Sequence, residues 1–207
     1  MHQKAEIQLR PFIRLAFYIA APLFFLAGVV WWIGIGAYEL GDHNLNYIEG
    51  MIAGVAIILF IPKYLFLAYY VSISHKILGG MIAVTGLFGC IGGFFWMIFF
   101  RTMSYEMLRY GIPATQLSQF WDEMSGVVNV FLMIGPLFPL CAILAGIALF
   151  KLTSVPSWTG IAIATGGVLF ITAQLVEIMA VYPLSLMLWA MAFPYAGWIL
   201  TEEKTAQ

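Results

Sequence analysis

The sequence predicts an all-α, polytopic membrane protein with six transmembrane helices and both termini in the cytoplasm. Of its 207 residues, 63% are hydrophobic and only 9% are charged. A soluble domain usually carries about 25% charged residues, so this chain has too few to cover a surface that faces water. Its apolar residues gather in stretches of about 20, which are long enough to cross a hydrocarbon core of about 30 Å. These stretches lack the alternation of barrel strands, so we expect helices.

The whole chain, 1–207, is predicted to form one transmembrane domain. Its first apolar run follows the basic segment "MHQKAEIQLRPFIR". That run is too long for the apolar region of a signal peptide and no small-residue cleavage site follows it, so we expect an uncleaved first helix. The six predicted spans are 13–38, 49–73, 77–100, 125–149, 158–181 and 184–200.

Lysine and arginine positions predict the orientation of these spans. With the amino end inside, the outer loops hold only Arg101 and Arg109, and the first outer loop, "ELGDHNLNYIEG", has carboxylates and no cation. Cytoplasmic loops carry the excess of Lys and Arg in membrane proteins, so both ends are expected in the cytoplasm. The cations that this orientation places inside are Lys4, Arg10, Arg14, Lys76, Lys151 and Lys204.

Residues 102–124 form the only long loop, which we expect on the extracytoplasmic side. Within "ATQLSQFWDEM", apolar side chains recur at i, i+3, i+4 and i+7, at Leu117, Phe120, Trp121 and Met124. This spacing predicts a short amphipathic helix at the membrane interface. The helix is interpreted either as a connector that rests its apolar face on lipid or as a lid over an outward-facing cavity.

The third span contains a glycine face within "GLFGCIGGFF". Gly89 and Gly93 are four residues apart, and Gly86 lies about one turn earlier. Small residues let helix backbones approach closely in lipid. We expect this face to pack against a neighbouring helix of the same chain rather than to form a dimer.

Lys63 is the most unusual residue in the sequence, because it lies near the middle of the second span, in "ILFIPKYLF". A lysine at the bilayer centre costs about 3 kcal/mol on insertion scales, so we expect it to face the bundle interior. The preceding Pro62 frees the carbonyl of Ile58 to accept a hydrogen bond. The anionic group that we expect to meet Lys63 is either Glu177, reached through water and Gln174 on the same face of the fifth span, or the carboxylate or phosphate of a ligand.

Prolines near the middle of four spans predict helix breaks around an internal polar cavity, because irregular backbone in a membrane needs partners or water. The predicted break positions are Pro22, Pro62, Pro136, Pro139 and Pro194. The predicted ligand-binding or pathway residues are Lys63, Gln174, Glu177, Asn129, Tyr195 and Thr85.

Several other chemistries find no support in the sequence. The histidines lie at a terminus, in a loop and at a helix end, and Cys90 and Cys141 are isolated within apolar spans, so neither a metal site nor a cofactor is expected. P-loop, dinucleotide and nucleophile-elbow motifs are absent. No basic cluster suggests a nucleic-acid partner.

The segment "GPLFPLCAILAGIALFKLTSVPSWTGIAIATGGVLF" combines a helix rich in Leu, Phe and Pro, a basic loop with Pro156, Ser157 and Trp158, and a Gly-Gly helix. In these features it resembles uncharacterised bacterial multi-pass inner-membrane proteins of domain-of-unknown-function type. The resemblance implies a bundle in the bacterial cytoplasmic (inner) membrane. It implies no activity and no functional residues.

The expected function is that of a non-enzymatic membrane protein whose internal polar cavity binds or transports a small molecule or an ion. One alternative is a structural or accessory subunit of a larger membrane complex. Another is a membrane-embedded enzyme that uses Lys63, whose amine can form a Schiff base when its charge is suppressed. The expected partners are the lipid bilayer, a small-molecule or ion ligand, and either a second copy of the chain or a larger complex.

Overall fold

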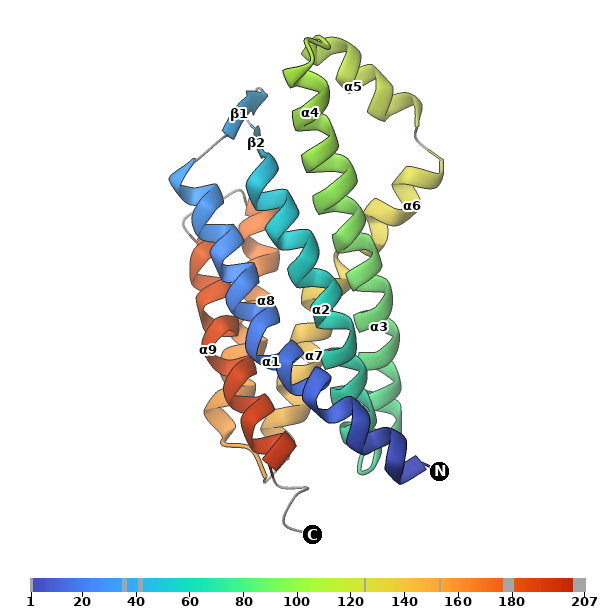
Figure 1. The fold of residues 1–207 in the computed structure, drawn as a ribbon, viewed down its shortest axis with the longest axis vertical. Coiled ribbons are helices and arrows are strands. Elements are labelled where there is room, and N and C mark those ends of the chain that lie inside the picture. Colours follow the sequence, from blue (N-terminus) through green and yellow to red (C-terminus); the bar gives the residue numbers. More distant parts are fainter. Residues whose placement is uncertain are drawn as a thin grey trace.

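The computed structural model describes residues 2–34, 37–40, 43–124, 126–152, 154–176 and 181–202, and they form a bundle of long helices (Figure 1). The helices are α1 (His2–Ile33), α2 (Tyr47–Ser72), α3 (Lys76–Phe95), the π-helix η1 (Trp96–Met103), α4 (Ser104–Arg109), α5 (Ala114–Glu123), α6 (Val127–Ile134), α7 (Leu137–Lys151), α8 (Ser157–Val176) and α9 (Val181–Glu202). The strands are β1 (Ala37–Leu40) and β2 (His43–Asn46).

Five stretches of the described chain are long and apolar enough to cross a membrane. They are Arg10–Ile33, Tyr47–Ser72, Lys76–Arg109, Ser157–Val176 and Val181–Glu202. The chain is therefore a multi-pass, helical integral membrane protein, as the sequence predicts. The predicted fourth span, 125–149, differs, because it is divided into α6 and the shorter apolar helix α7 by a turn at Gly135 and Pro136.

The long helices form a closed ring of neighbours. Helix α1 packs on α2 and α9, α2 packs on α3, α3 on α7, and α7 on α8, which returns to α9. The start of α1 and the end of α9 lie at the same end of the bundle, which we call the inner end (Figure 1). There, Arg14 Nη2 lies 3.2 Å from Glu202 Oε1.

The opposite, outer end carries a short β-hairpin between α1 and α2. Strands β1 and β2 are antiparallel, with Ala37 opposite Asn46. Asn46 is also the N-cap of α2, where its side-chain oxygen accepts a hydrogen bond from the backbone N–H of Glu49 at 3.1 Å. The hairpin was not predicted, and the predicted first span reaches residue 38, whereas α1 ends at Ile33.

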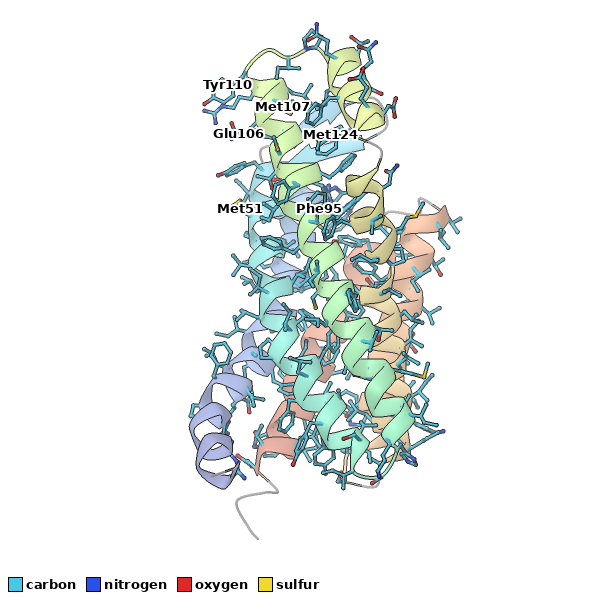
Figure 2. All side chains as sticks on the ribbon, turned by 90° about the vertical axis from the view of Figure 1, so that its right-hand side faces the viewer. Met51, Phe95, Glu106, Met107, Tyr110 and Met124 are labelled. Carbon is cyan, nitrogen blue, oxygen red and sulfur yellow. The ribbon has the colours of Figure 1, made fainter. Side chains whose placement is uncertain are left out.

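Helices α3, η1 and α4 follow one another without a break as a rod of 34 residues, Lys76–Arg109. At 1.5 Å per residue the rod is about 51 Å long, so it exceeds a hydrocarbon core of about 30 Å. Its outer part projects beyond the other long helices, where Figure 2 shows Glu106, Met107 and Tyr110. The predicted helix end at residue 100 was therefore wrong, and residues 102–109 are helical.

The predicted amphipathic helix is present as α5, and its apolar face packs back on α4. Leu117 is buried against Leu108 in a small cluster separate from the main core. The indole N–H of Trp121 donates to the hydroxyl of Ser104 at 3.0 Å. This face is therefore used for packing within the chain, which neither sequence interpretation anticipated.

The glycine face of α3 packs inside the bundle, as predicted. A Cβ added at Gly86 would lie 2.8 Å from Cβ of Tyr64, and one added at Gly92 would lie 2.6 Å from the backbone nitrogen of Gly135. Gly89 is equally tight against the backbone of Phe138. In a membrane, such close approach gives the van der Waals contact that holds helices together.

The predicted helix breaks are seen at only one place. Helices α1, α2 and α9 continue through Pro22, Pro62 and Pro194, and Pro139 lies in the first turn of α7. Only Pro136 stands at a helix boundary, as the N-cap of α7. Neighbouring helices can compensate the lost backbone hydrogen bond in a membrane, which explains why the other helices remain continuous.

Candidate functional site

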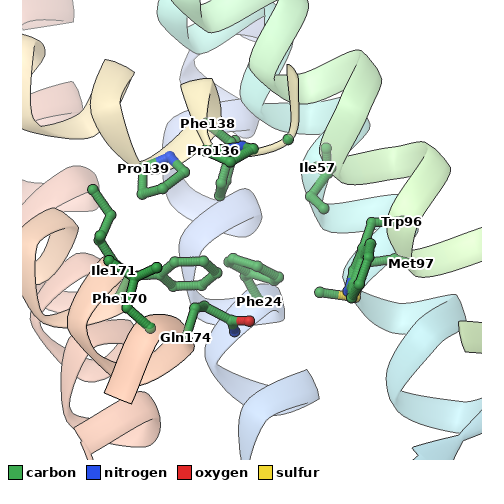
Figure 3. Close-up of a pocket in the computed structure, with 13 residues that line it drawn as sticks. Phe24, Ile57, Trp96, Met97, Pro136, Phe138, Pro139, Phe170, Ile171 and Gln174 are labelled. Atoms are coloured by element: carbon green, nitrogen blue, oxygen red, sulfur yellow. The ribbon is translucent and has the colours of Figure 1, made fainter. Parts of the chain in front are cut away.

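A cavity of about 220 Å³ lies between the helices toward the outer end of the bundle (Figure 3). Its walls come from α1, α2, α3, η1, α7, α8 and the turn between α6 and α7. The lining residues are Phe24, Ile57, Gly93, Trp96, Met97, Gly135, Pro136, Phe138, Pro139, Phe170, Ile171, Gln174 and Leu175. Nearly all are apolar or aromatic, which is typical of pockets for small organic molecules.

Two irregular backbone segments border this cavity. Trp96 and Met97 are the first residues of η1, and Gly135 and Pro136 form the turn before α7. π-Helices are rare and frequently occur at functional sites. Two interruptions of regular α-helix thus border the cavity, in addition to the continuous helices α1, α2 and α8.

Part of the cavity lining reaches the surface of the bundle. Pro136, Gln174 and Leu175 are exposed, and 78% of the Leu175 surface is accessible. Gln174 and Leu175 lie within the last three residues of α8, so this exposed part of the lining is near the outer end of that span.

A cluster of aromatic rings fills the interior beside the cavity. The Phe24 and Phe138 rings, which line the cavity, are 5.6 Å apart, and Phe138 lies 5.1 Å from Phe60. Trp189 packs within 6.3 Å of Phe24 and within 5.4 Å of Phe170. These rings separate the cavity from the inner half of the bundle.

Lys63 lies on the other side of this aromatic cluster. Its side chain is fully buried, and Nζ is 3.1 Å from the ring centre of Phe60 and 3.5 Å from that of Phe193. Nζ has no hydrogen-bond partner among the described residues. Lys63 therefore faces the interior but does not line the cavity, and its closest neighbours are π faces, which attract cations.

Thr85 belongs to the same inner region as Lys63. Its hydroxyl donates to the carbonyl of Met81 at 2.7 Å, and one residue later Gly86 packs between Tyr64 and Cys141. The thiol of Cys141 donates to the carbonyl of Ile82 at 3.4 Å. The hydroxyl and the thiol thus use backbone carbonyls of α3, which satisfies them within the bundle.

The other predicted site residues are dispersed. Asn129 is exposed on α6, and Tyr195 packs against Trp158 and Trp198 with ring centres 5.1 and 5.7 Å apart. Glu177 lies outside the described residues. Of the predicted ligand-binding or pathway residues that the structure describes, Gln174 alone lines the cavity, and these described residues do not gather into one polar site around Lys63.

A buried ion pair at the outer end was not predicted as a site. Arg101 Nη1 lies 2.7 Å from Glu49 Oε1, and the Glu49 side chain is fully buried while that of Arg101 is 14% exposed. Arg101 belongs to η1, and Glu49 to the first turn of α2. The pair joins the start of α2 to the π-helix beside the cavity.

The sequence contained a signal for this pair. Glu49 and Arg101 lie at nearly equal distances from the short turn between α2 and α3, at residues 73–75. When a short turn joins two antiparallel helices, residues at equal distances from the turn lie opposite each other along the bundle axis. The hydropathy pattern predicts both residues in outer loops, so their pairing was not predicted.

Among the residues that the structure describes, no three His, Cys, Asp or Glu side chains are grouped so that they could hold a metal ion. Comparison of the chain with protein-family models, curated proteins and solved structures finds no match.

Proposed function

We propose that this protein binds a small, largely apolar molecule that enters its cavity sideways from the bilayer. The observation that carries the proposal is the cavity of about 220 Å³, with its apolar lining and its exposed edge at Leu175. Moving apolar surface from water into such a pocket yields about 25 cal/mol per Å². A molecule already dissolved in lipid gains less, so shape and polar contacts would decide which molecule is bound.

The lining favours an organic molecule over an ion. An ion that leaves water needs rings of carbonyl or charged groups to replace its hydration shell. Here the walls are mainly rings and aliphatic side chains, and Gln174 supplies the one amide side chain among the lining residues. The aromatic cluster that includes Phe60 and Trp189 fills the route toward the inner end, which favours binding over passage through the bundle.

We also propose that the chain crosses the bacterial inner membrane six times. Helices α6 and α7, taken together, cover 127–151 and could form one crossing with a break at Pro136. An even number of crossings agrees with the position of the start of α1 and the end of α9 at one end of the bundle (Figure 1). The Lys and Arg distribution supports a cytoplasmic location for that end.

The experiment uses Trp96 as a reporter, because it lines the cavity. The purified protein is reconstituted in lipid nanodiscs and titrated with 1-bromooctane, whose bromine quenches nearby indoles. Subtraction of the signal of a Trp96→Phe variant isolates Trp96 from the other tryptophans. We expect quenching of Trp96 that saturates with concentration, as occupancy of a site requires.

A pair of variants on α8 provides the control. Ile171→Phe adds bulk inside the cavity and should abolish the saturating component. Val168→Phe introduces the same side chain one turn earlier, at a position that is 51% exposed and does not line the cavity, and should leave the saturating component unchanged. Quenching that rises linearly in every protein would mean simple partition into lipid, and the proposal would fail.

The alternative role, as an accessory subunit, makes a different prediction. A subunit whose outer helices dock a larger partner should co-purify with that partner in a fixed ratio after mild solubilisation. A binding protein of the proposed kind should be recovered as its own chain and still show saturable quenching of Trp96.

A further inference from the structure

The cavity is small, which limits a bound molecule to about one ring. Its volume is about 220 Å³. An apolar protein cavity of about 150 Å³ can hold one benzene molecule, whereas pockets for drug-sized molecules usually exceed about 300 Å³. A six-membered ring with one or two small substituents therefore fits here, and larger ring systems do not.

Lipid itself competes for this cavity, because acyl chains surround a membrane protein at high concentration. An apolar molecule gains little when it leaves lipid for an equally apolar pocket. A ligand that is bound in preference to an acyl chain must therefore make contacts that a saturated chain cannot make. The described lining offers two kinds of such contact, which are aromatic rings and one side-chain amide.

The ring contacts come from two sides of the cavity. Figure 3 shows Trp96 on one side and Phe24 with Phe170 on the other. Aromatic pairs prefer offset-stacked or edge-to-face arrangements and attract each other beyond ordinary apolar burial. A ligand ring placed between these two sides can make such contacts, whereas an acyl chain cannot.

The lining rings are held in place by further rings behind them. Trp189 is fully buried and stacks on Phe170 and Phe24, with interplanar angles of 17° and 15°. Its indole N–H donates to a backbone carbonyl of α8 at 3.0 Å. Trp96 stacks on Phe100 with ring centres 4.4 Å apart. Rings that are fixed before binding lose little freedom when a ligand arrives, which favours a flat molecule of matching shape.

The amide contact comes from Gln174. Figure 3 shows its amide group beside Phe24, directed toward the Trp96 side of the cavity. Among the described residues this amide has no hydrogen-bond partner, and every described lining residue is uncharged. An amide donates through its nitrogen and accepts through its oxygen, so it can bind a hydroxyl or a carbonyl group. A charged substituent would find no counter-charge among these residues.

We propose that the ligand is a neutral one-ring aromatic compound, whose ring lies between Trp96 and Phe24 and whose hydroxyl or carbonyl group is bound by the Gln174 amide. This inference rests on the proposed function and names the class of ligand for the same cavity. The ring and the polar substituent make separate contributions to affinity, and each can be measured.

Three brominated probes test the two contributions in the Trp96 quenching assay. Bromocyclohexane and bromobenzene have the same number of carbon atoms and differ in aromatic character, and 4-bromobenzyl alcohol adds a hydroxyl group. After correction for partition into the lipid, bromobenzene should bind about fivefold more tightly than bromocyclohexane, the effect of one aromatic pair. The alcohol should bind about fivefold more tightly than bromobenzene, the net effect of one hydrogen bond.

Gln174→Leu removes the amide and keeps a side chain of similar size. It should lower the affinity for the alcohol to that for bromobenzene and leave bromobenzene binding unchanged, which also shows that the variant is folded. Gln119→Leu is the matched control, at an exposed position of α5 that does not line the cavity, and should change no affinity. Two charged probes, 4-bromobenzoate and 4-bromobenzylammonium, should bind no better than bromobenzene.

Failure of this inference and failure of the proposed function give different results. Equal binding of bromocyclohexane and bromobenzene would overturn the ring site, and an alcohol preference that is absent or survives Gln174→Leu would overturn the role of the amide. Tightest binding of a charged probe would overturn the neutrality of the ligand. Each of these results rejects the inference and leaves the proposed function intact. Absence of saturable quenching by every probe, 1-bromooctane included, would reject both.

Discussion

Lys63 shows how a lysine side chain can be buried among aromatic rings, with no hydrogen-bond partner for its amine among the described residues. Its amine lies between the rings of Phe60 and Phe193, at 3.1 and 3.5 Å from their centres. Such contacts are worth about 2 kcal/mol when desolvated, comparable to the insertion cost of about 3 kcal/mol for a centred lysine. For the protonated amine, the rings therefore compensate a large part of that cost.

Substitution of Lys63 by Met should leave the protein at least as stable as the wild type. Methionine has a similar length and packs well beside rings, and no described anion loses its partner. Replacement of a buried charge by an apolar side chain is often neutral or stabilising by about 1–4 kcal/mol. Reversible unfolding in mixed micelles measures the difference.

A control variant covers Glu177, which lies outside the described residues. If Lys63→Met destabilises the protein and the further change Glu177→Gln restores the lost stability, the two residues are coupled and Lys63 has an anionic partner. In that case the aromatic account of Lys63 is wrong.

The Glu49–Arg101 pair should be far more important for stability than an exposed pair. Arg101→Met leaves the fully buried Glu49 carboxylate without its cation, which typically costs about 3–5 kcal/mol. Arg109→Met removes the same type of side chain from the exposed pair with Glu106 and should cost less than about 1 kcal/mol. Equal losses in the two unfolding measurements would show that the buried pair contributes no more than a surface contact.

At this scale, the sequence predicts the burial of Lys63 but not its surroundings. A charged side chain in the middle of an apolar span is expected to face the bundle interior, and this expectation depends on the sequence of that span alone. Phe193, in contrast, lies on α9, and its contact with Lys63 depends on how the ring of helices closes. Hydropathy does not indicate which helices become neighbours in that ring.

Among the elements, the contact of α3 with the α6–α7 turn is the most sensitive to side-chain size. Gly92→Ala would place a Cβ 2.6 Å from the backbone nitrogen of Gly135, which cannot rotate away. We expect a loss of about 1–3 kcal/mol in unfolding free energy, the usual cost of overpacking. Because this turn borders the cavity, saturable quenching of Trp96 should also weaken.

Gly80→Ala is the matched control in the same helix. No atom lies within 4 Å of a Cβ added there, so only the higher helix propensity of alanine acts, which stabilises by about 1 kcal/mol or less. Equal effects of the two substitutions would mean that Gly92 has no packing role.

The length of the α3–η1–α4 rod illustrates what sequence reasoning can miss about elements. The apolar run ends near residue 100, and that end was interpreted as the end of the helix. Hydropathy marks where lipid ends, however, and a helix continues until its backbone is interrupted. The first interrupting residues are Gly111, with φ of +84°, and Pro113, and both are readable from the sequence.

At the scale of the whole molecule, the two ends of the chain should lie on one side of the membrane and α5 on the other. Gln207→Cys and Ser118→Cys, the latter at an exposed position of α5, can be labelled with a membrane-impermeant maleimide in intact cells. Cys90 and Cys141 are buried, so background labelling should be low. We expect Ser118→Cys to be labelled in intact cells and Gln207→Cys only after the cells are opened. Labelling of both in intact cells would contradict six crossings with internal ends.

The class of fold was predictable because it follows from composition and segment length, which apply to each helix separately. The site was not, because the cavity is formed jointly by residues as distant in sequence as Phe24, Trp96 and Gln174. Polar residues drew attention in the sequence, whereas the structure surrounds its cavity mainly with apolar ones. Apolar residues are too frequent in this chain to mark a site by themselves.

The central claim, that the cavity holds a small membrane-soluble molecule, is tested most directly by mass spectrometry of the natively purified protein. We expect about one such molecule per chain in the wild type and in Val168→Phe, and its loss in Ile171→Phe, which fills the cavity. Detection of only bulk lipids, in equal amounts in all three proteins, would contradict the account.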